Sequence, residues 1–427
     1  MKDFILKIRL ILEDKYLSQK IFFVIFALIL FRIMANIPIP AAAGASLDAL
    51  LASNQALGFL NILTGGGLSA ISIVMLGVGP YITASIIMQL LTMMSERLKT
   101  LYHEEGEVGR RKFMQISRRL TIPLSLMQGY GLIWFLHTQG VIPQMSAAEL
   151  AVNVIIVSAG SMVLMWIGEL ISEFGIGNGV SLIIFAGIVA GLPSTIGQLW
   201  FTANPITDPS LIPLYVGFVI AAIAIMLGVV TVTEAERPVP ITYAKKVRGT
   251  KTYGGVSTYL PIRVNQAGVI PIIFALSLLI FPQVIVNFMS FVDNETIQRV
   301  SIAIQDFLAN TVATSVIYFF LVFAFTFFYT AVTFDPDAIA TNLQKSGAFV
   351  PGVRPGHSTS EYLAKVLSRI TFIGATFLSV VAVLPFAMIA LTGVQGLAIG
   401  GTALLIVVSV VLDLVKKIDA QLSMREY

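Results

Sequence analysis

The sequence predicts an all-α, polytopic membrane protein with ten transmembrane helices, and three observations lead to that prediction. First, 56% of the 427 residues are hydrophobic and only 12% are charged, whereas soluble domains carry about 25% charged residues. Second, the chain contains ten long apolar runs. Third, its basic residues gather in alternate connections between these runs. The chain also has no cysteine, which excludes disulfides and thiolate chemistry.

The ten apolar runs are close to the length that a transmembrane helix needs, about 20 residues. A further apolar stretch, 57–71, is too short and too rich in glycine to cross a membrane alone. The predicted spans are 20–37, 72–94, 118–137, 152–171, 179–200, 212–233, 268–290, 307–332, 366–390 and 396–413.

The region around the first run allows two interpretations. Basic residues precede the run and three alanines, Ala41–Ala43, follow it, as in a cleavable signal peptide. The preceding region also contains acidic residues, however, and its apolar residues recur at helical spacing. We therefore favour a cytoplasmic amphipathic helix on the membrane surface, followed by a retained transmembrane helix. The apolar residues of that surface helix are Phe4, Ile5, Ile8, Ile11 and Leu12.

The basic residues predict the orientation of the chain. When the connections are assigned to alternate sides, 25 of the 27 Lys and Arg residues fall on one side. The other side holds Arg299 alone, and Arg32 lies inside the first run. The positive-inside rule then places both termini and the large basic loops in the cytoplasm of a cell-membrane protein. Ten spans also suggest two halves of five, 1–200 and 201–427, because an odd number per half gives inverted orientations.

Few ionisable side chains interrupt the apolar runs. Arg32 lies within the first run, Glu169 and Glu173 near the end of the fourth, and Asp413 at the end of the tenth. A charge at the bilayer centre costs about 2.5–3.5 kcal/mol on insertion scales and often marks an ion or proton pathway. Because these four residues do not form a chain or a ring, we favour interfacial or helix-end positions for them.

Several enzyme classes have no support in the sequence. The nucleotide-binding motif G-x-x-x-x-G-K-[ST] does not occur, and no Ser/His/Asp arrangement is suggested. The three histidines, His103, His137 and His357, are far apart in the sequence, so a metal site is not expected. We therefore expect no enzyme activity, no cofactor and no metal, and any work must be driven by a partner or a gradient.

Residues 58–72 precede the second run and include three consecutive glycines, Gly65–Gly67. They continue into the motif GVGPYITASIIMQL at 77–90. Non-helical backbone at membrane depth is tolerated only where protein or a water-filled cavity satisfies its polar groups. Two interpretations stay open for 58–72: a movable plug, or a re-entrant segment with a packing role.

A glycine-rich motif and a basic loop are also distinctive. Gly175–Gly179 reads GIGNG; taken alone, it is best interpreted as an ordinary short loop, although glycine also permits close packing. The loop 234–267 is long and basic, and long ordered loops are usually functional. Its charge suits RNA phosphates or an acidic partner, but setting topology or contacting anionic lipid explains it equally well.

The last distinctive segment is 333–363. Asp335-Pro336 predicts the start of a short helix, and Gly347–Gly356 predicts a loop rich in proline and glycine. Ser358 and Glu361 have the spacing of a capping box for the next helix. Arg354 lies at the loop tip, either as a docking group for carboxylates or phosphates or as a solvated side chain.

Four of these segments, taken in order, resemble the SecY family of protein translocase subunits. The matching stretches are 77–90, 175–191, 267–282 and 349–356, and the plan of ten helices covers nearly the whole chain. The resemblance implies a protein-conducting channel shaped like an hourglass, with two inverted halves of five helices around a central pore. Such a channel passes unfolded secretory polypeptides across the membrane and releases hydrophobic segments sideways into the lipid bilayer.

The resemblance also implies roles for individual residues. A constriction of aliphatic side chains gives no segment of a passing chain a strong partner, and it dewets when narrow. The implied pore ring consists of Val78, Ile82, Val180, Ile184, Ile273 and Ile406. The implied plug residues are Leu60, Asn61, Leu63, Thr64, Gly65, Gly66, Gly67 and Leu68. The implied lateral gate, between the second and third helices and the seventh and eighth, includes Gln89, Thr92, Gln128 and Asn265.

Partners follow from the same resemblance. The loops 234–267 and 333–363 are expected to dock the motor ATPase SecA or the ribosome, through Lys245, Lys246, Arg248, Lys251 and Arg354. Thr250-Lys251 stands where many members carry two basic residues, which is a departure from the family pattern. Small membrane subunits SecE and SecG, signal peptides, nascent polypeptides and membrane lipids complete the expected partners.

Two other function classes compete with this interpretation. A secondary transporter with broken helices would share the helix count and the glycine break, but it is expected to carry ionisable or polar groups near the midplane. An intramembrane enzyme would need a nucleophile or metal ligands within its helices. The sequence offers neither feature, so both classes are disfavoured.

Overall fold

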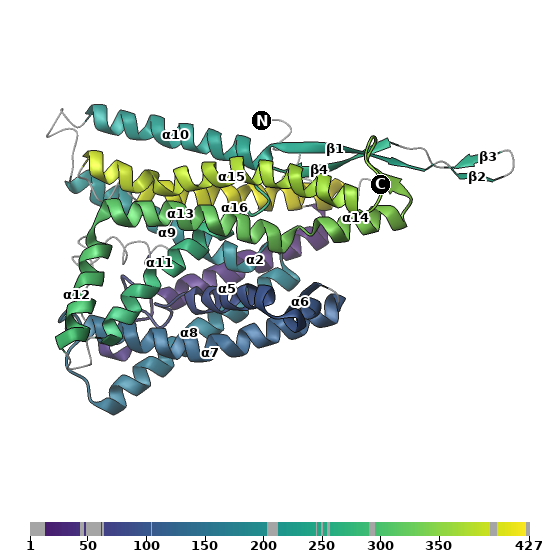
Figure 1. Cartoon of the computed structure of the whole chain (residues 1–427). Helices are drawn as coiled ribbons and strands as arrows, with labels where there is room; N and C mark the ends of the chain where they lie inside the picture. Colours follow the sequence, from purple (N-terminus) through teal and green to yellow (C-terminus); the bar gives the residue numbers. More distant parts are fainter. Residues whose placement is uncertain are drawn as a thin grey trace.

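The computed structural model describes residues 13–42, 47, 61, 64–103, 105–202, 212–244, 246–248, 251–253, 257–289, 295–392 and 399–423. The described chain is mostly helical, and its long helices run side by side (Figure 1). Strands extend from one end of this bundle, while α12 lies across the other end (Figure 1). The predicted amphipathic residues Phe4, Ile5, Ile8, Ile11 and Leu12 lie outside the described residues.

In the described part of the N-terminal half there are six helices and one short 3-10 turn, η1 (Pro40–Ala42). Asp14 caps the first of these helices by accepting hydrogen bonds from the backbone N–H groups of Tyr16 and Leu17. The helices are α2 (Lys15–Ala35), α5 (Gly79–Met94), α6 (Glu96–His103), α7 (Gly106–Thr138), α8 (Ala147–Phe174) and α9 (Gly179–Thr202).

The other helices and the strands that the structure describes belong to the C-terminal half. The helices are α10 (Ile212–Glu234), α11 (Ile270–Met289), α12 (Glu295–Ala309), α13 (Thr311–Thr333), α14 (Pro336–Lys345), α15 (His357–Thr392) and α16 (Ile399–Ser423). The strands are β1 (Glu236–Tyr243), β2 (Lys246–Arg248), β3 (Lys251–Tyr253), β4 (Ser257–Arg263) and β5 (Ala348–Phe349).

Each of the ten predicted apolar runs overlaps a long helix of the structure, and the run 307–332 also includes the last residues of α12. The second run differs most. Its helix, α5, begins only at Gly79, so residues 72–78 are not helical. Gly77 has a φ of +57°, a left-handed conformation that interrupts a helix, and Pro80 lies in the first turn of α5, where proline is tolerated. Within the described residues, four helical segments are long and apolar enough to cross a membrane: Lys15–Ala35, Ala147–Phe174, Thr311–Lys345 and His357–Met388.

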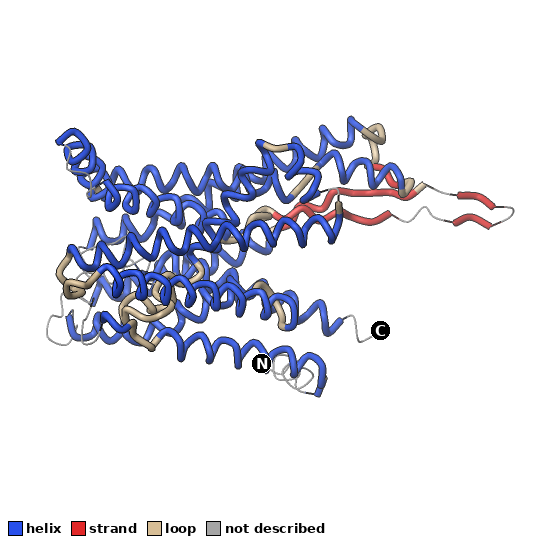
Figure 2. Tube along the Cα trace, turned by 90° about the horizontal axis from the view of Figure 1, so that it is seen from below, coloured by secondary structure: helices blue, strands red, loops and turns tan. Residues whose placement is uncertain are grey.

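The prediction of a purely helical protein is wrong in the two basic loops. Strands β1 and β4 pair in antiparallel fashion from Glu236↔Arg263 to Thr242↔Ser257, and β5 pairs with the other edge of β1. The sheet order is therefore β4-β1-β5, with a separate β2–β3 pair at the tip of the projection (Figure 2). Alternate residues of β1 are buried, with Val239 and Ile241 facing inward, as expected for a half-buried strand.

The sheet packs on the helices through a small apolar core. Val239 of β1, Ile262 of β4 and Val350 after β5 are buried against Leu363 and Leu367 of α15. The sheet thus forms one body with the start of α15. By contrast, many large apolar side chains on the bundle exterior are exposed, including Phe22 at 73%, Phe320 at 63% and Ile220 at 62%. Apolar surface of this extent suits contact with lipid rather than water.

The segment between the sheet and α15 confirms one predicted helix start and corrects another. Asp335 caps α14 by accepting hydrogen bonds from the N–H groups of Asp337 and Ala338. The predicted capping box of Ser358 and Glu361 is wrong, because α15 already begins at His357. Ser358 therefore lies within the first helical turn, and Glu361 pairs with His357 instead, at 3.5 Å.

Candidate functional site

The helix α9 passes three different environments on successive turns. Ser181 lies beside a polar cavity, Ile184 is buried in the apolar core, and Gly187 touches the backbone of Gly65. Because an α-helix rises about 1.5 Å per residue, these levels follow one another within roughly 9 Å. The helix therefore gives a natural axis along which the site can be described.

The six residues predicted to form the pore ring come from four places in the chain. Val78 and Ile82 lie at the start of α5, Val180 and Ile184 in the first turns of α9, Ile273 in α11 and Ile406 in α16. Five of them are buried members of one hydrophobic cluster, and Val180 is a partly buried residue that packs against the same cluster. We call these six residues the waist.

The chemistry of the waist is uniform. All six side chains are aliphatic, so none can hold an ion or form a hydrogen bond with a passing group. A narrow aliphatic constriction excludes water and thereby raises the barrier to ions. The arrangement therefore suits a seal that has no preference for any particular side chain.

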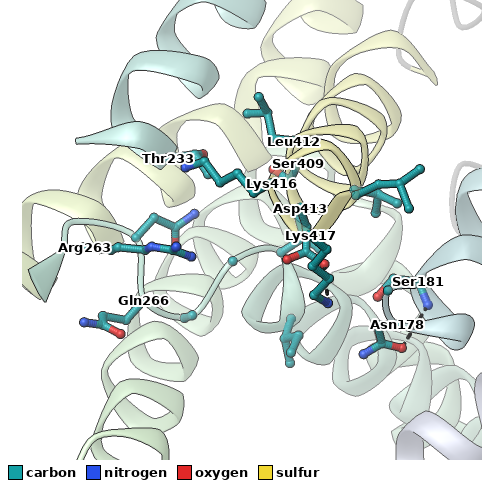
Figure 3. Close-up of a pocket in the computed structure, with 18 of the residues that line it drawn as sticks. Asn178, Ser181, Thr233, Arg263, Gln266, Ser409, Leu412, Asp413, Lys416 and Lys417 are labelled. Carbon is teal, nitrogen blue, oxygen red and sulfur yellow. Dashed lines mark hydrogen bonds and ion pairs between the residues drawn. The ribbon is translucent and has the colours of Figure 1, made fainter. Parts of the chain in front are cut away.

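A cavity of about 230 Å³ with both polar and apolar lining residues lies on one side of the waist, and we call it the vestibule. Figure 3 shows polar side chains around it, including Asn178 and Ser181 at the start of α9, Arg263 and Gln266 before α11, and Asp413, Lys416 and Lys417 from α16. Each of these groups lies within about ten residues of a waist residue along the chain. Lys416 also pairs with Glu234 at 3.8 Å, which places the vestibule at the end of the bundle that carries the sheet.

The glycine-rich motif forms a short loop between α8 and α9, and its last residue, Gly179, also packs closely on α8, next to the waist residue Val180. A Cβ built on Gly179 would overlap the carbonyl oxygen of Gly168 in α8. The N–H of Gly179 donates a 2.9 Å hydrogen bond to Ser172 Oγ, and the N–H of Val180 donates to Asn178 Oδ1 at 3.1 Å. Helices α8 and α9 therefore meet at backbone distance, which only glycine permits.

On the other side of the waist lies the plug segment, residues 58–72, of which Asn61 and 64–72 are described. Leu60 and Leu63 lie outside the described residues. Leu68 and Ile71 are fully buried together with Met75 in a second hydrophobic cluster. Two backbone hydrogen bonds join the end of the segment to the residues that follow α2. The N–H of Ile39 donates to the carbonyl of Ile71 at 3.0 Å, and the N–H of Ile73 donates to the carbonyl of Ile37 at 2.9 Å.

Backbone contacts with two helices hold this segment and its connection to α5. Gly65 and Gly187 touch directly, since a Cβ built on Gly65 would lie 2.9 Å from Gly187 Cα. A Cβ built on Gly160 of α8 would overlap the carbonyl oxygen of Ile73. The next residue of α8, Ser161, donates a 2.8 Å hydrogen bond to the buried carbonyl of Gly77. The contacts leave no room for side chains at these glycines.

The predicted gate residues lie on α5, on α7 and before α11. Helix α11 contacts both α5 and α7. Gln128 of α7 reaches Thr83 of α5 at 3.5 Å, and Thr92 donates to the carbonyl of Gln89 at 2.6 Å. Gln89 Oε1 and Asn265 Oδ1 are buried without a hydrogen-bond partner among the described residues. Asn265 also lines the vestibule.

Three of the four charges in the apolar runs have specific partners. Glu169 accepts a 2.6 Å charge-assisted hydrogen bond from Arg118 Nε of α7, and Asp413 pairs with Lys417 at 2.7 Å. Arg32 donates from Nη1 to the carbonyl oxygen of Gly65 at 2.9 Å. The interpretation as interfacial or helix-end groups therefore misses the contacts of Arg32 and Glu169 with distant elements. The free-energy cost of a charged side chain in a membrane is the sequence signal that could have indicated these contacts.

The predicted docking residues gather at the sheet. Lys246 and Arg248 lie in β2 and Lys251 in β3, whereas Lys245 lies outside the described residues. Arg354 is exposed in the turn after β5, and its carbonyl accepts a 2.9 Å hydrogen bond from Thr359 Oγ1. Since β5 pairs with β1, the two basic loops, about 100 residues apart in sequence, belong to one sheet.

Together these features indicate a class of protein, a helical membrane channel, with a buried aliphatic cluster and a glycine-rich segment packed against α9. Among the residues that the structure describes, no group of three or more His, Asp or Glu side chains could hold a metal ion. The candidate site thus consists of the waist, the vestibule, the plug segment and the sheet.

Comparisons with known proteins place the chain within this class. The model of the SecY family matches residues 72–415. Protein translocase subunits SecY from Halalkalibacterium halodurans and Streptomyces coelicolor are 41% and 40% identical over 417 and 431 residues, with 96% of each chain covered. That of Staphylococcus aureus is 39% identical over 423 residues, covering 97% of this chain and 96% of its own. The chain belongs to the SecY family.

Solved structures share the fold at lower sequence identity. A protein-conducting channel superposes with a TM-score of 0.66 at 19% identity, covering 95% of this chain and 92% of the other. A SecY structure, described by the role of its plug domain in stabilising the closed channel, gives a TM-score of 0.64 at 19% identity. Sec61 from a canine ribosome-channel complex gives 0.63 at 18% identity, again over 95% and 92% of the two chains.

Proposed function

We propose that this chain is the protein-conducting subunit of a translocase, through which unfolded secretory polypeptides cross the cell membrane. The observation that carries the proposal is the succession of vestibule, waist and plug contact along α9, at Ser181, Ile184 and Gly187. A polar entrance, an apolar constriction and a displaceable segment beneath it are the parts that such a passage needs.

The three levels have complementary tasks in this mechanism. The vestibule is lined by amide, hydroxyl and charged groups, so it can solvate the backbone of an entering extended chain. The waist then closes around the chain with aliphatic side chains, which bind no residue type strongly and keep water and ions out. The plug segment moves aside when a chain enters and returns to its place against α9 afterwards.

A sideways exit explains the contacts of α11. We assign the lateral gate to the seam between α5 and α7 on one side and α11 and α13 on the other. Polar side chains along this seam can form hydrogen bonds with a hydrophilic chain. They belong to Gln89, Thr92, Gln128 and Asn265. A hydrophobic segment instead gains about 0.3–0.6 kcal/mol per large aliphatic residue at the membrane centre, so it partitions through the seam into lipid.

The proposed membrane arrangement follows the basic residues. Ten helices cross the membrane: α2, α5, α7, α8 and α9 from the half 1–200, and α10, α11, α13, α15 and α16 from the half 201–427. The two halves are inverted repeats around the pore. Both termini and the sheet face the cytoplasm, since 25 of the 27 basic residues fall on that side. The helix α12, which carries Arg299, then lies at the outer surface.

Partners are assigned from the same geometry. SecA or a translating ribosome docks on the sheet through Lys245, Lys246, Arg248, Lys251 and Arg354, because a projecting basic surface suits acidic side chains or RNA phosphates. A Sec61 relative has been solved in a ribosome-channel complex. SecE and SecG, as small membrane subunits, contact the lipid-facing helices. Signal peptides and nascent chains are the cargo.

Reconstitution tests the proposal. The chain, purified in mild detergent with the small membrane subunits that accompany it, is placed in vesicles with SecA, ATP and a secretory precursor. Protection of the precursor from added protease reports its entry. We expect entry that needs an intact signal sequence; vesicles that transport a small solute but leave the precursor exposed would favour a secondary transporter instead.

The variant Arg354→Glu tests the docking surface separately. Reversing this exposed charge repels carboxylates and phosphates, so precursor entry driven by SecA should fall about tenfold, while the recovered amount of folded complex stays the same. The matched control is Arg299→Glu, a reversal of an exposed arginine in α12, which should leave entry unchanged. Equal rates for both variants and the parent would remove Arg354 from the docking surface.

A further inference from the structure

Arg32 is an isolated cation in an apolar helix. It lies in the last turn of α2, whereas the other basic residues of that helix, Lys15 and Lys20, lie near its start. Its guanidinium Nη1 donates a 2.9 Å hydrogen bond to the carbonyl oxygen of Gly65, which is 33 residues away in the sequence. A buried or lipid-facing charge is retained only where it has a partner, and here the partner is the backbone of the plug segment.

Gly65 is placed so that this carbonyl is available. Its φ of +71° is a left-handed conformation, which favours glycine, and its Cα packs against Gly187 of α9 and the ring of Phe31 of α2. Two helices therefore fix the position of one peptide, α9 by direct contact and α2 by contact and hydrogen bond. A shift of the plug segment breaks both contacts together.

Apart from the backbone hydrogen bond from Ile39 N–H to the Ile71 carbonyl at the end of the segment, most other hydrogen bonds of the described plug segment lie within it. The N–H of Ser69 donates to Asn61 Oδ1 at 2.9 Å, and Ser69 Oγ donates to the carbonyl of Gly66 at 2.7 Å. The N–H of Gly66 donates to the carbonyl of Asn61 at 2.9 Å. These bonds travel with the segment when it moves, so they do not oppose its displacement. The bond from Arg32 joins the segment to a different helix and does oppose it.

We propose that Arg32 is the positioning residue that holds the plug segment closed, through its hydrogen bond to the Gly65 carbonyl. The inference rests on the proposed function, in which residues 58–72 leave the passage when a polypeptide enters. A charge-assisted hydrogen bond is about twice as strong as a neutral one. The bond from Arg32 thus adds to the burial of Leu68 and Ile71 and to the Ile39–Ile71 bond in favouring the closed position, and it re-forms when the segment returns.

The absence of cysteine from the sequence allows a direct measurement. A single cysteine is introduced as Ala70→Cys. Ala70 is half-buried within the plug segment, and the substitution removes no side-chain hydrogen bond. The complex in vesicles is exposed, on the side away from the sheet, to a maleimide that cannot cross the membrane. The labelling rate reports how often the segment leaves its closed position.

Two variants are compared with the parent and with one control. Arg32→Met removes the donor, so labelling should become about tenfold faster, the change expected for losing a hydrogen bond to a charged group. Arg32→Lys keeps the charge but shortens the side chain and loses the planar fork, so its rate should lie between the two. Lys20→Met removes a cation from the other end of α2 and should leave the rate at the parent value.

The outcomes separate this inference from the proposed function. Faster labelling in the order Met, Lys, parent, with equal recovery of complex and an equal thermal midpoint, supports Arg32 as the positioning residue. Equal labelling of the parent and both Arg32 variants overturns it, even if the parent imports precursor normally. If Arg32→Met does not assemble, the comparison of Arg32→Lys with the parent decides. Failure of the parent to import precursor would instead refute the channel function.

Discussion

The waist and the plug segment lie next to each other along α9, yet they are held in place by different forces. The waist consists of aliphatic side chains packed in one hydrophobic cluster. The plug segment and its connection to α5 are held at backbone level, by the Gly65–Gly187 contact, the Arg32 hydrogen bond and the hydrogen bond from Ser161 to Gly77. The waist relies on non-directional burial alone, whereas the plug segment adds a few directional contacts to the burial of Leu68 and Ile71.

The difference fits the tasks that we propose for the two regions. A ring that closes around any sequence gains from attraction without direction, because dispersion and burial depend on area rather than on a particular partner. A segment that leaves and returns to one position needs contacts that only that position satisfies. We therefore expect the waist to tolerate exchanges among apolar residues and the plug contacts to tolerate almost none.

The largest effect should come from placing a polar group in the waist, as in Ile406→Asn or Ile82→Asn. An unpaired amide among buried aliphatic side chains costs about 1–3 kcal/mol and draws water into the constriction. The ion conductance of the resting channel in planar bilayers should rise roughly tenfold or more, since about 1.4 kcal/mol corresponds to tenfold. The control is Val415→Asn, on an exposed face of α16. Parent-level conductance in both waist variants would disprove the role of the ring.

A somewhat smaller effect is expected from Gly187→Ala, which disrupts the backbone contact between Gly187 and Gly65. The new Cβ would overlap Gly65 Cα, and overpacking of this kind costs about 1–3 kcal/mol. The plug segment should therefore be displaced and resting conductance should rise several-fold. Gly191→Ala is the matched control, because it adds the same methyl to the same helix where no atom lies within 4 Å. Identical conductance in the two variants would mean that the glycine contact is dispensable.

Ser161→Ala should have a moderate effect. It removes the hydrogen bond to the buried Gly77 carbonyl, which contributes about 1 kcal/mol. Hydrogen exchange of the backbone over 64–78, followed by mass spectrometry, should accelerate about fivefold or less. Ser158→Ala in the same helix is the comparison, because Ser158 Oγ has no hydrogen-bond partner among the described residues. Acceleration of the same size in Ser158→Ala would show that loss of a hydroxyl from α8, and not this bond, is responsible.

The smallest effect is predicted for Ile273→Leu in the waist. The two side chains have the same volume and polarity, and such exchanges usually cost less than about 1.5 kcal/mol. Resting conductance and precursor entry should both stay within about twofold of the parent. A loss as large as that of Gly187→Ala would contradict the view that the waist is non-directional, and would indicate shape-specific packing instead.

The positions of the helices were predictable because their signal is local. Runs of apolar residues between basic loops are visible in any window of the sequence, and each predicted run overlaps a helix. The start of α5 was not predicted. The apolar run continues through Gly77 without a break in hydrophobicity, but the left-handed backbone of Gly77 prevents a helix there. The strands β1 and β4 were missed because Pro238, Pro240 and Pro261 obscure the alternation of their apolar residues.

The site was only partly predictable for a different reason. The waist residues were assigned through family resemblance at four motifs, and composition alone did not distinguish them from other buried aliphatic residues. The contacts of Gly65 with Gly187, and of Arg32 with Gly65, join elements far apart in the sequence, so no local pattern encodes them. The sequence signal for the second contact was Arg32 itself, a charged residue in an apolar run with no evident partner nearby in the sequence.

The sheet that unites the two basic loops has a consequence for docking. Strand β4 leads directly into α11, which carries Ile273 of the waist, and β5 leads into α15. In the proposed function, a motor or ribosome that docks on both loops therefore binds one sheet, and engaging two points at once raises its avidity without new contacts. Only the short connection 264–269 separates that sheet from α11, so the proposed docking surface and the waist residue Ile273 lie on neighbouring parts of one continuous stretch of chain.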